Sequence, residues 1–218
     1  ANTTADANTA IGRNALTTST TGSSNTAVGE SALSLSTTAS DNTAIGKSAL
    51  QENTTGEKNV AVGVTSLTLN TTGNQNSAFG MLALNANTTA NENAAFGYAS
   101  LASNTTGTAN TACGRAALNA NTTASNNTGV GTNALVSNTT GTNNTAAGTS
   151  AGDVLTTGTH NVIIGSGADP SAASGTSQVV VGAALTGKGN STAFIGGSLG
   201  AYNGANGTTW STTSDIRI

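Results

Sequence analysis

One glycine recurs every 17 residues along most of this chain, and no insertion or deletion interrupts its spacing. An asparagine lies four residues before each of the first ten of these glycines. Self-similarity at a fixed period is the signature of repeat architectures, so it constrains the fold before any local motif does. The sequence therefore predicts a solenoid. The glycine row consists of Gly12, Gly29, Gly46, Gly63, Gly80, Gly97, Gly114, Gly131, Gly148, Gly165 and Gly182.

Each repeat is too short for the helix pairs of the common helical solenoids, whose periods exceed about 30 residues. Short segments punctuated by Gly, Asn and Thr-Thr favour strands and tight turns. We expect one strand in residues 8–12, a second around Ala15 and Leu16, and a turn at Asn-Thr-Thr-Gly segments such as residues 53–56. The predicted fold class is all-β: a parallel β-roll or β-helix solenoid of 17-residue coils, stacked about 4.8 Å apart.

The composition leaves disorder as an alternative, because apolar residues are few and only 7% of the 218 residues are charged. Disordered chains combine low hydrophobicity with high net charge, whereas this chain has a net charge of −3 and a strict repeat. The slightly acidic balance argues against a nucleic-acid partner. No apolar run approaches the roughly 20 residues of a membrane span. We therefore expect neither nucleic-acid binding nor membrane insertion.

Three apolar rows follow the same period. The alanine row is Ala10, Ala27, Ala44, Ala61, Ala78, Ala95, Ala112, Gly129, Ala146 and Ile163. The Ile/Val/Phe row, one residue later, is Ile11, Val28, Ile45, Val62, Phe79, Phe96, Cys113, Val130, Ala147 and Ile164. The leucine row is Leu16, Leu33, Leu50, Leu67, Leu84, Leu101, Leu118 and Leu135.

Neighbouring residues of a strand face opposite sides, so the alanine row and the Ile/Val/Phe row cannot share one interior. Small alanines suit the narrow interior, which leaves the second row in need of a cover. Self-association would supply one, and threefold closure about the long axis is the form we expect. Phe79 and Phe96 should stack in this row. The single cysteine, Cys113, replaces an apolar residue and is interpreted as a small buried hydrophobe.

The Asn-Thr-Ala-Ile-Gly and Ala-Leu cadence resembles the head repeats of trimeric autotransporter adhesins and the related repeats of phage tail fibres. The resemblance covers about residues 1–165, although the familiar head repeat is shorter than 17 residues. It implies left-handed coils, a homotrimer and a structural or adhesive role. The protein would then belong to a virion tail fibre or to a cell surface, and its partner would be a host cell-surface glycan or protein receptor.

Three regions are expected: a repeat shaft over residues 1–165, irregular coils over 166–213, and the start of a junction at 214–218. The irregular region is either a plain cap, as terminal repeats of solenoids usually are, or a receptor-binding tip. In the second case Tyr202 and Trp210 would be its exposed aromatic contacts.

The segment from Trp210 to Ile218 resembles the junction before the C-terminal intramolecular chaperone of endosialidase-type tail spikes, which reads Ser-Asp-x-Arg-x-Lys. Ser214, Asp215 and Arg217 match, and the lysine would follow Ile218. The resemblance implies that the chaperone assists trimer assembly and then cleaves itself off before Ser214. A serine needs a neighbouring base to become a nucleophile, so we expect no activity from these 218 residues.

Other chemistry is sparse. His160 is the lone histidine and has no companion cysteine, so we expect no metal, no cofactor and no enzyme activity. The main alternative to a fibre is an ice-binding solenoid that presents the Thr-Thr pairs, such as Thr54 and Thr55. Adjacent threonines of a strand face opposite sides, which counts against that alternative. An enzymatic spike is a more distant third.

Overall fold

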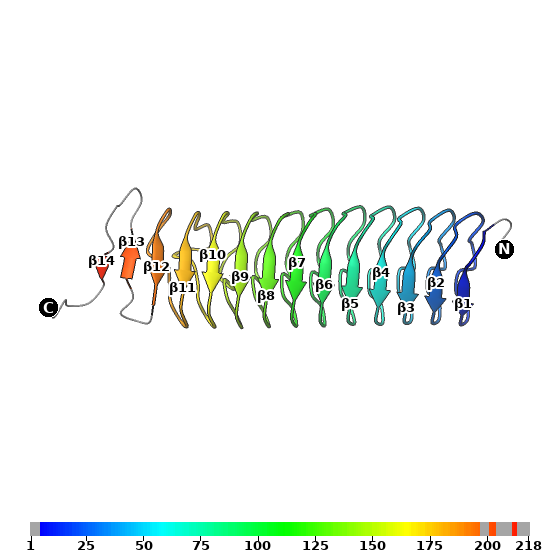
Figure 1. Cartoon of the computed structure of the whole chain (residues 1–218), viewed down its shortest axis with the longest axis horizontal. Helices are drawn as coiled ribbons and strands as arrows, with labels where there is room; N and C mark the ends of the chain where they lie inside the picture. Colours follow the sequence, from blue (N-terminus) through cyan, green and yellow to red (C-terminus); the bar gives the residue numbers. More distant parts are fainter. Residues whose placement is uncertain (1–4, 197–200, 204–210, 213–218) are drawn as a thin grey trace.

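The computed structural model describes residues 5–196, 201–203 and 211–212, and its strands follow one another in a single row (Figure 1). The sheet order equals the chain order from β1 to β14. The strands are β1 (Thr9–Ile11), β2 (Thr26–Val28), β3 (Thr43–Ile45), β4 (Val60–Val62), β5 (Ser77–Phe79), β6 (Ala94–Phe96), β7 (Thr111–Cys113), β8 (Thr128–Val130), β9 (Thr145–Ala147), β10 (Val162–Ile164), β11 (Val179–Val181), β12 (Ala193–Ile195), β13 (Ala201–Asn203) and β14 (Ser211–Thr212).

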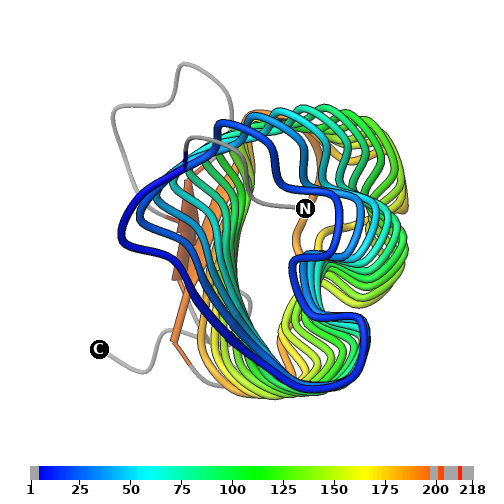
Figure 2. The same ribbon diagram turned by 90° about the vertical axis from the view of Figure 1, so that its right-hand side faces the viewer.

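The pairing register reproduces the sequence period. Strands β1 to β12 pair in parallel, and through β11 each residue faces the residue 17 positions later, as Thr9 faces Thr26. The last parallel step is shorter, because Val179 of β11 faces Ala193 of β12, 14 residues on. β13 and β14 then add antiparallel strands. Successive coils nearly eclipse one another when viewed along the axis (Figure 2). The predicted parallel β-solenoid of 17-residue coils is confirmed.

The interior contains the two rows that the sequence assigned to it. From the second coil onward the alanine row is fully buried, and so is the leucine row from Leu33 to Leu135. Where the pattern loosens, the packing compensates. Gly152 occupies the next leucine position, and a methyl group there would come within 3.0 Å of the Ile163 side chain. Ile163 stands in the alanine row and is fully buried, so a larger residue in one row fills the space that the other leaves.

The second expected strand, around Ala15 and Leu16, is wrong. These residues form a turn, and Leu16 has a φ of 50°. Leu33 and Leu50 repeat that left-handed conformation at 49° and 50°. Left-handed backbone is disfavoured for residues with a Cβ. The leucine side chain reaches the core only through this turn, so its burial, about 1.5–3 kcal/mol per side chain, offsets the strain.

The asparagines four residues before the glycine row form a buried ladder along the interior, instead of serving only as turn residues. Asn42 is typical. Its Nδ2 donates to Gly56 O at 2.9 Å and to Asn25 Oδ1 at 3.2 Å, and its Oδ1 accepts the backbone N–H of Asn59 at 2.9 Å. The first asparagine ladder consists of Asn8, Asn25, Asn42, Asn59, Asn76, Asn93, Asn110, Asn127, Asn144 and Asn161.

A second asparagine ladder lies within the Asn-Thr-Thr turns and meets the first at shared carbonyls. Asn53 Nδ2 donates to Gly56 O at 2.9 Å, the same oxygen that Asn42 reaches. Asn70 Nδ2 then donates to Asn53 Oδ1 at 2.8 Å. The second asparagine ladder consists of Asn53, Asn70, Asn87, Asn104, Asn121 and Asn138. Together the ladders satisfy backbone groups that a coil with one short strand would otherwise bury unpaired.

One carboxylate lies close to the end of the second ladder, and we predict that it makes stability depend on pH. Burial raises the pKa of Asp169, and the charge of Asp153 raises it further, while backbone N–H groups of Asp153 and Val154 offset part of the shift. A raised pKa means that the folded state binds the proton more tightly than the unfolded state. This contribution therefore favours folding at low pH and is lost as pH rises through the ordinary carboxyl range.

Asp169→Asn should consequently raise the melting temperature at pH 7 and change it less at pH 4, because the neutral amide keeps an acceptor oxygen without the charge. Thermal unfolding followed by circular dichroism at both pH values measures this. Glu57→Gln, on an exposed side chain, is the control and should have little effect at either pH. An equal effect of Asp169→Asn at both pH values would contradict the prediction.

Candidate association surface

The Ile/Val/Phe row lies on the outer face of the sheet, opposite the alanine row. In most strands the middle residue is buried and the two ends face outward, as the alternation of a strand requires. The predicted outward orientation of this row is confirmed. Its most exposed members are Ile11 (61%), Ile45 (40%), Phe79 (37%), Phe96 (41%), Val130 (43%) and Ile164 (42%), and Ile195 of β12 extends it (41%).

Two aromatic rings stack in the middle of this row. The centroids of Phe79 and Phe96 lie 5.0 Å apart and their planes differ by 8°, which confirms the predicted stack. Cys113 follows them in the row and is exposed. The interpretation of Cys113 as a buried hydrophobe is therefore wrong for the single chain. The position accepts apolar side chains because it faces outward beside other apolar residues, and no interior packing restricts it.

A second outward row widens the apolar surface. We name it the trailing row, because it follows the glycine row: Arg13, Glu30, Lys47, Val64, Met81, Tyr98, Arg115, Thr132, Thr149, Ser166 and Ala183. Val64, Met81 and Tyr98 are 46%, 46% and 45% exposed, and they follow directly on Val62, Phe79 and Phe96. The sequence reasoning did not single out this row. Three consecutive large apolar residues at one exposed repeat position were the available signal.

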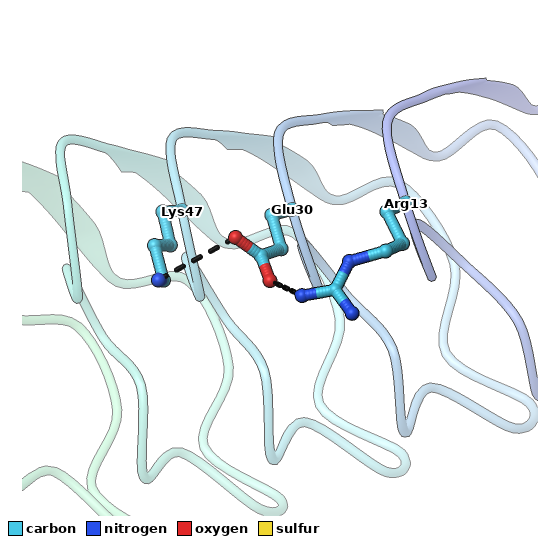
Figure 3. A network of polar contacts seen from close by, with 3 residues as sticks. All are labelled: Arg13, Glu30 and Lys47. Carbon is cyan, nitrogen blue, oxygen red and sulfur yellow. Dashed lines mark hydrogen bonds and ion pairs between the residues drawn. The ribbon is translucent and has the colours of Figure 1, made fainter.

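The trailing row begins with a charged network. Glu30 lies between Arg13 of the preceding coil and Lys47 of the following one, and it forms ion pairs with both (Figure 3). The Lys47 Nζ to Glu30 Oε2 distance is 3.4 Å. The Arg13 guanidinium, followed by the Lys47 ammonium, lowers the pKa of Glu30. These side chains are exposed, so their attraction is screened by solvent and adds little stability.

A further exposed row consists of threonines. In each Thr-Thr pair the first hydroxyl donates to a carbonyl of the next coil, as Thr54 Oγ1 does to Thr71 O at 2.9 Å. The second threonine is exposed in every coil, and its hydroxyl donates no hydrogen bond within the described part of the chain. This threonine row is Thr21, Thr38, Thr55, Thr72, Thr89, Thr106, Thr123, Thr140 and Thr157.

The residues proposed for the tip and the junction lie mostly outside the described residues. Trp210 and Ser214 are not described, and for Tyr202 only the backbone is, where it pairs with Phe194 between β13 and β12. Within residues 5–196 and the two short strands beyond them, no group of three metal-binding side chains occurs. No helix in that same part is long and apolar enough to cross a membrane.

Comparison with known proteins adds no relative from which a role could be transferred. No family model, no curated protein and no solved structure matches this chain. The function must therefore be argued from the association surface itself.

Proposed function

We propose that this chain is a shaft segment of a fibre, built by self-association of three copies in parallel about the Ile/Val/Phe row. One observation carries the proposal: an apolar row stays exposed along the whole length of a solenoid whose interior polar groups are otherwise satisfied by ladders. At about 4.8 Å per coil, the row from β1 to β12 is about 50 Å long. Monomeric proteins rarely leave such a continuous apolar surface uncovered.

Threefold closure and left-handed coils are part of the proposal, because the repeat resembles those of tail fibres and trimeric adhesin heads. The mechanism is mechanical. Continuous strand pairing makes each copy stiff along its axis, and a shared apolar centre makes separation of the copies costly. Recognition of a host glycan or protein receptor is delegated to the irregular C-terminal region, where Tyr202 and Trp210 are the proposed contacts. A bacterial adhesin head would use the same assembly.

Cys113 offers a direct test, because it is a natural probe in the proposed interface. Light scattering should give about three times the mass of one chain, as expected for a closed cyclic oligomer. Mild oxidation or a short bismaleimide should link Cys113 between copies. The Cys113→Ser variant carrying Thr106→Cys moves the thiol to the exposed threonine row and should cross-link far less. A monomer in solution, or equal cross-linking of both variants, would contradict the proposal.

The junction resemblance leads to a second part of the proposal, self-cleavage before Ser214 in a longer precursor. A gene extended past Ile218 should yield a shortened stable fibre, as seen by mass spectrometry. Ser214→Ala should leave the precursor at full length because the nucleophile is gone. Shortening of the Ser214→Ala precursor at the same site would contradict this role for the serine.

The exposed threonine row keeps ice binding as a second candidate function. The structure answers part of the earlier objection: one threonine of each pair turns inward, and the other presents its hydroxyl in a regular line. Measurement of thermal hysteresis separates the two functions. Hysteresis from a monomeric chain, lost on replacing several of these threonines, would favour ice binding over the fibre.

A further inference from the structure

The trailing row changes chemistry along the shaft in three blocks. Coils 1–3 (residues 8–58) place charged Arg13, Glu30 and Lys47 there, and coils 4–6 (residues 59–109) place apolar Val64, Met81 and Tyr98. Coils 7–9 (residues 110–160) return to Arg115 followed by threonines. The backbone of these coils is equivalent, because all pair in the same register. Local structure therefore gives no reason for the blocks.

A second outward row changes at the same coils. We name it the leading row, because it is the first residue of each strand: Thr9, Thr26, Thr43, Val60, Ser77, Ala94, Thr111, Thr128, Thr145, Val162 and Val179. In coils 1–3 and 7–9 it is always threonine, and in coils 4–6 it is Val60, Ser77 and Ala94. Through nine coils, a threonine accompanies a polar or charged trailing residue, and a small residue other than threonine accompanies a large apolar one.

Within one chain the two rows do not adjoin. The leading residue lies about 7 Å from the Ile/Val/Phe residue of its strand, and the trailing residue lies beyond that on the other side. Phe96, for example, stands between Ala94 and Tyr98 in sequence. The match between leading and trailing rows therefore needs contact with something other than the same coil.

A second copy in parallel orientation supplies that contact. When two parallel copies face each other across the Ile/Val/Phe row, the leading row of one lies opposite the trailing row of the other at the same level. Antiparallel copies would instead place like rows together and reverse the coil order. We propose that Val64, Met81 and Tyr98 of one copy pack on Val60, Ser77 and Ala94 of the next, and that this contact sets the register of the fibre. The inference rests on the self-association proposed above.

Near-identical coils need such a device, because copies could otherwise slip by one coil at little cost. A slip in one direction places Arg115 against Ala94 and Val64 against Thr43. A slip in the other direction places Lys47 against Val60. In each case a charge is forced against an apolar surface and a large apolar side chain loses its apolar neighbour, and both changes are unfavourable. The aligned register avoids both.

Disulfide trapping tests the register. Two differently tagged copies, both carrying Cys113→Ser, are co-expressed: one has Tyr98→Cys and the other has Ala94→Cys. All substituted side chains are at least partly exposed, so the coils should keep their fold. The offset pairs combine Tyr98→Cys with Ser77→Cys or with Thr111→Cys. A disulfide requires Cα atoms within about 7 Å, so a one-coil displacement of about 4.8 Å should lower the yield of mixed-tag disulfide by about tenfold.

The outcomes separate this inference from the fibre proposal. Light scattering of the reduced mixtures first establishes whether the copies assemble. A monomer overturns the fibre proposal and the register with it. Assembly with equal yields in aligned and offset pairs, or with Tyr98→Cys linked mainly to its own kind, overturns the register alone. Mixed-tag disulfide concentrated in the aligned pair supports it.

A charge rescue provides a second measurement that does not depend on oxidation. Met81→Lys should shift the assembly towards monomer by placing an ammonium against Ser77 of the next copy. Adding Ser77→Glu in the same chain should restore assembly, because each copy then offers a carboxylate at the level of its neighbour's lysine. Adding Ala94→Glu instead, one coil away, should restore less. Equal rescue by both would overturn the proposed register.

Discussion

Gly97→Ala should destabilise the solenoid by about 3 kcal/mol or more, because two costs add at this position. Gly97 has a φ of 132°, a region that residues with a Cβ rarely adopt. A methyl group would also meet the backbone of the next coil, 2.6 Å from Gly114 O. That oxygen belongs to the equivalent glycine, so neither partner can move aside without disturbing its own coil. Urea unfolding followed by circular dichroism measures the loss.

Gly189→Ala is the matched control, because Gly189 has nearly the same φ, 130°, but no atom lies within 4 Å of the added methyl group. It carries only the backbone strain, about 1–3 kcal/mol. The difference between the two variants isolates the close approach of stacked coils. Equal losses would contradict the view that stacking requires the glycine row, and would leave its conformation as the sole reason for it.

The fold was predictable from the sequence because parallel stacking at one fixed period leaves the register no freedom. Once Thr9 pairs with Thr26, every later strand follows, and strand alternation separates the alanine row from the Ile/Val/Phe row. The turn at Leu16 was not predictable in the same way. Its left-handed conformation is unfavourable locally, and only the burial of the side chain against neighbouring coils stabilises it.

The association surface was predictable in part. Phe79 and Phe96 could be placed on it because alternation and stacking together fix both their side and their spacing. Tyr98 could not be placed, since it follows a glycine with φ of 132° and alternation no longer applies past that residue. The asparagine ladders were hidden for another reason: asparagine suits left-handed turns as well as buried hydrogen bonds, so its presence alone does not separate the two.

Asn93→Ala should cost about 2–4 kcal/mol, because it removes a buried acceptor as well as filling less of the interior. Asn93 Oδ1 accepts the backbone N–H of Asn110 at 3.0 Å and its Nδ2 at 3.2 Å. Asn110 Nδ2 keeps Ala124 O as a partner, at 2.8 Å. Its backbone N–H keeps none after the substitution. An unpaired buried donor of this kind costs about 1–3 kcal/mol.

Asn87→Ala, in the second asparagine ladder, removes the same atoms from an equally buried site but orphans no backbone N–H. Asn87 Oδ1 accepts only the amide of Asn104, at 3.0 Å, and that amide also donates to Gly107 O at 2.9 Å. We therefore expect Asn87→Ala to cost less than Asn93→Ala by about 1–3 kcal/mol in urea unfolding. Equal costs would show that lost volume, and not the backbone donor, dominates.

The sequence already behaves as this difference requires. The first ladder is unbroken through ten coils, and where it changes, Gln178 still donates its backbone N–H to Asn161 Oδ1 at 3.0 Å. The second ladder gives way to Ser36 at one end and Leu155 at the other. Leu155 leaves Asn138 Oδ1 without a partner among the described residues, and the solenoid continues beyond it. An acceptor that serves only a side chain can be given up, whereas one that serves the backbone must be kept in every coil.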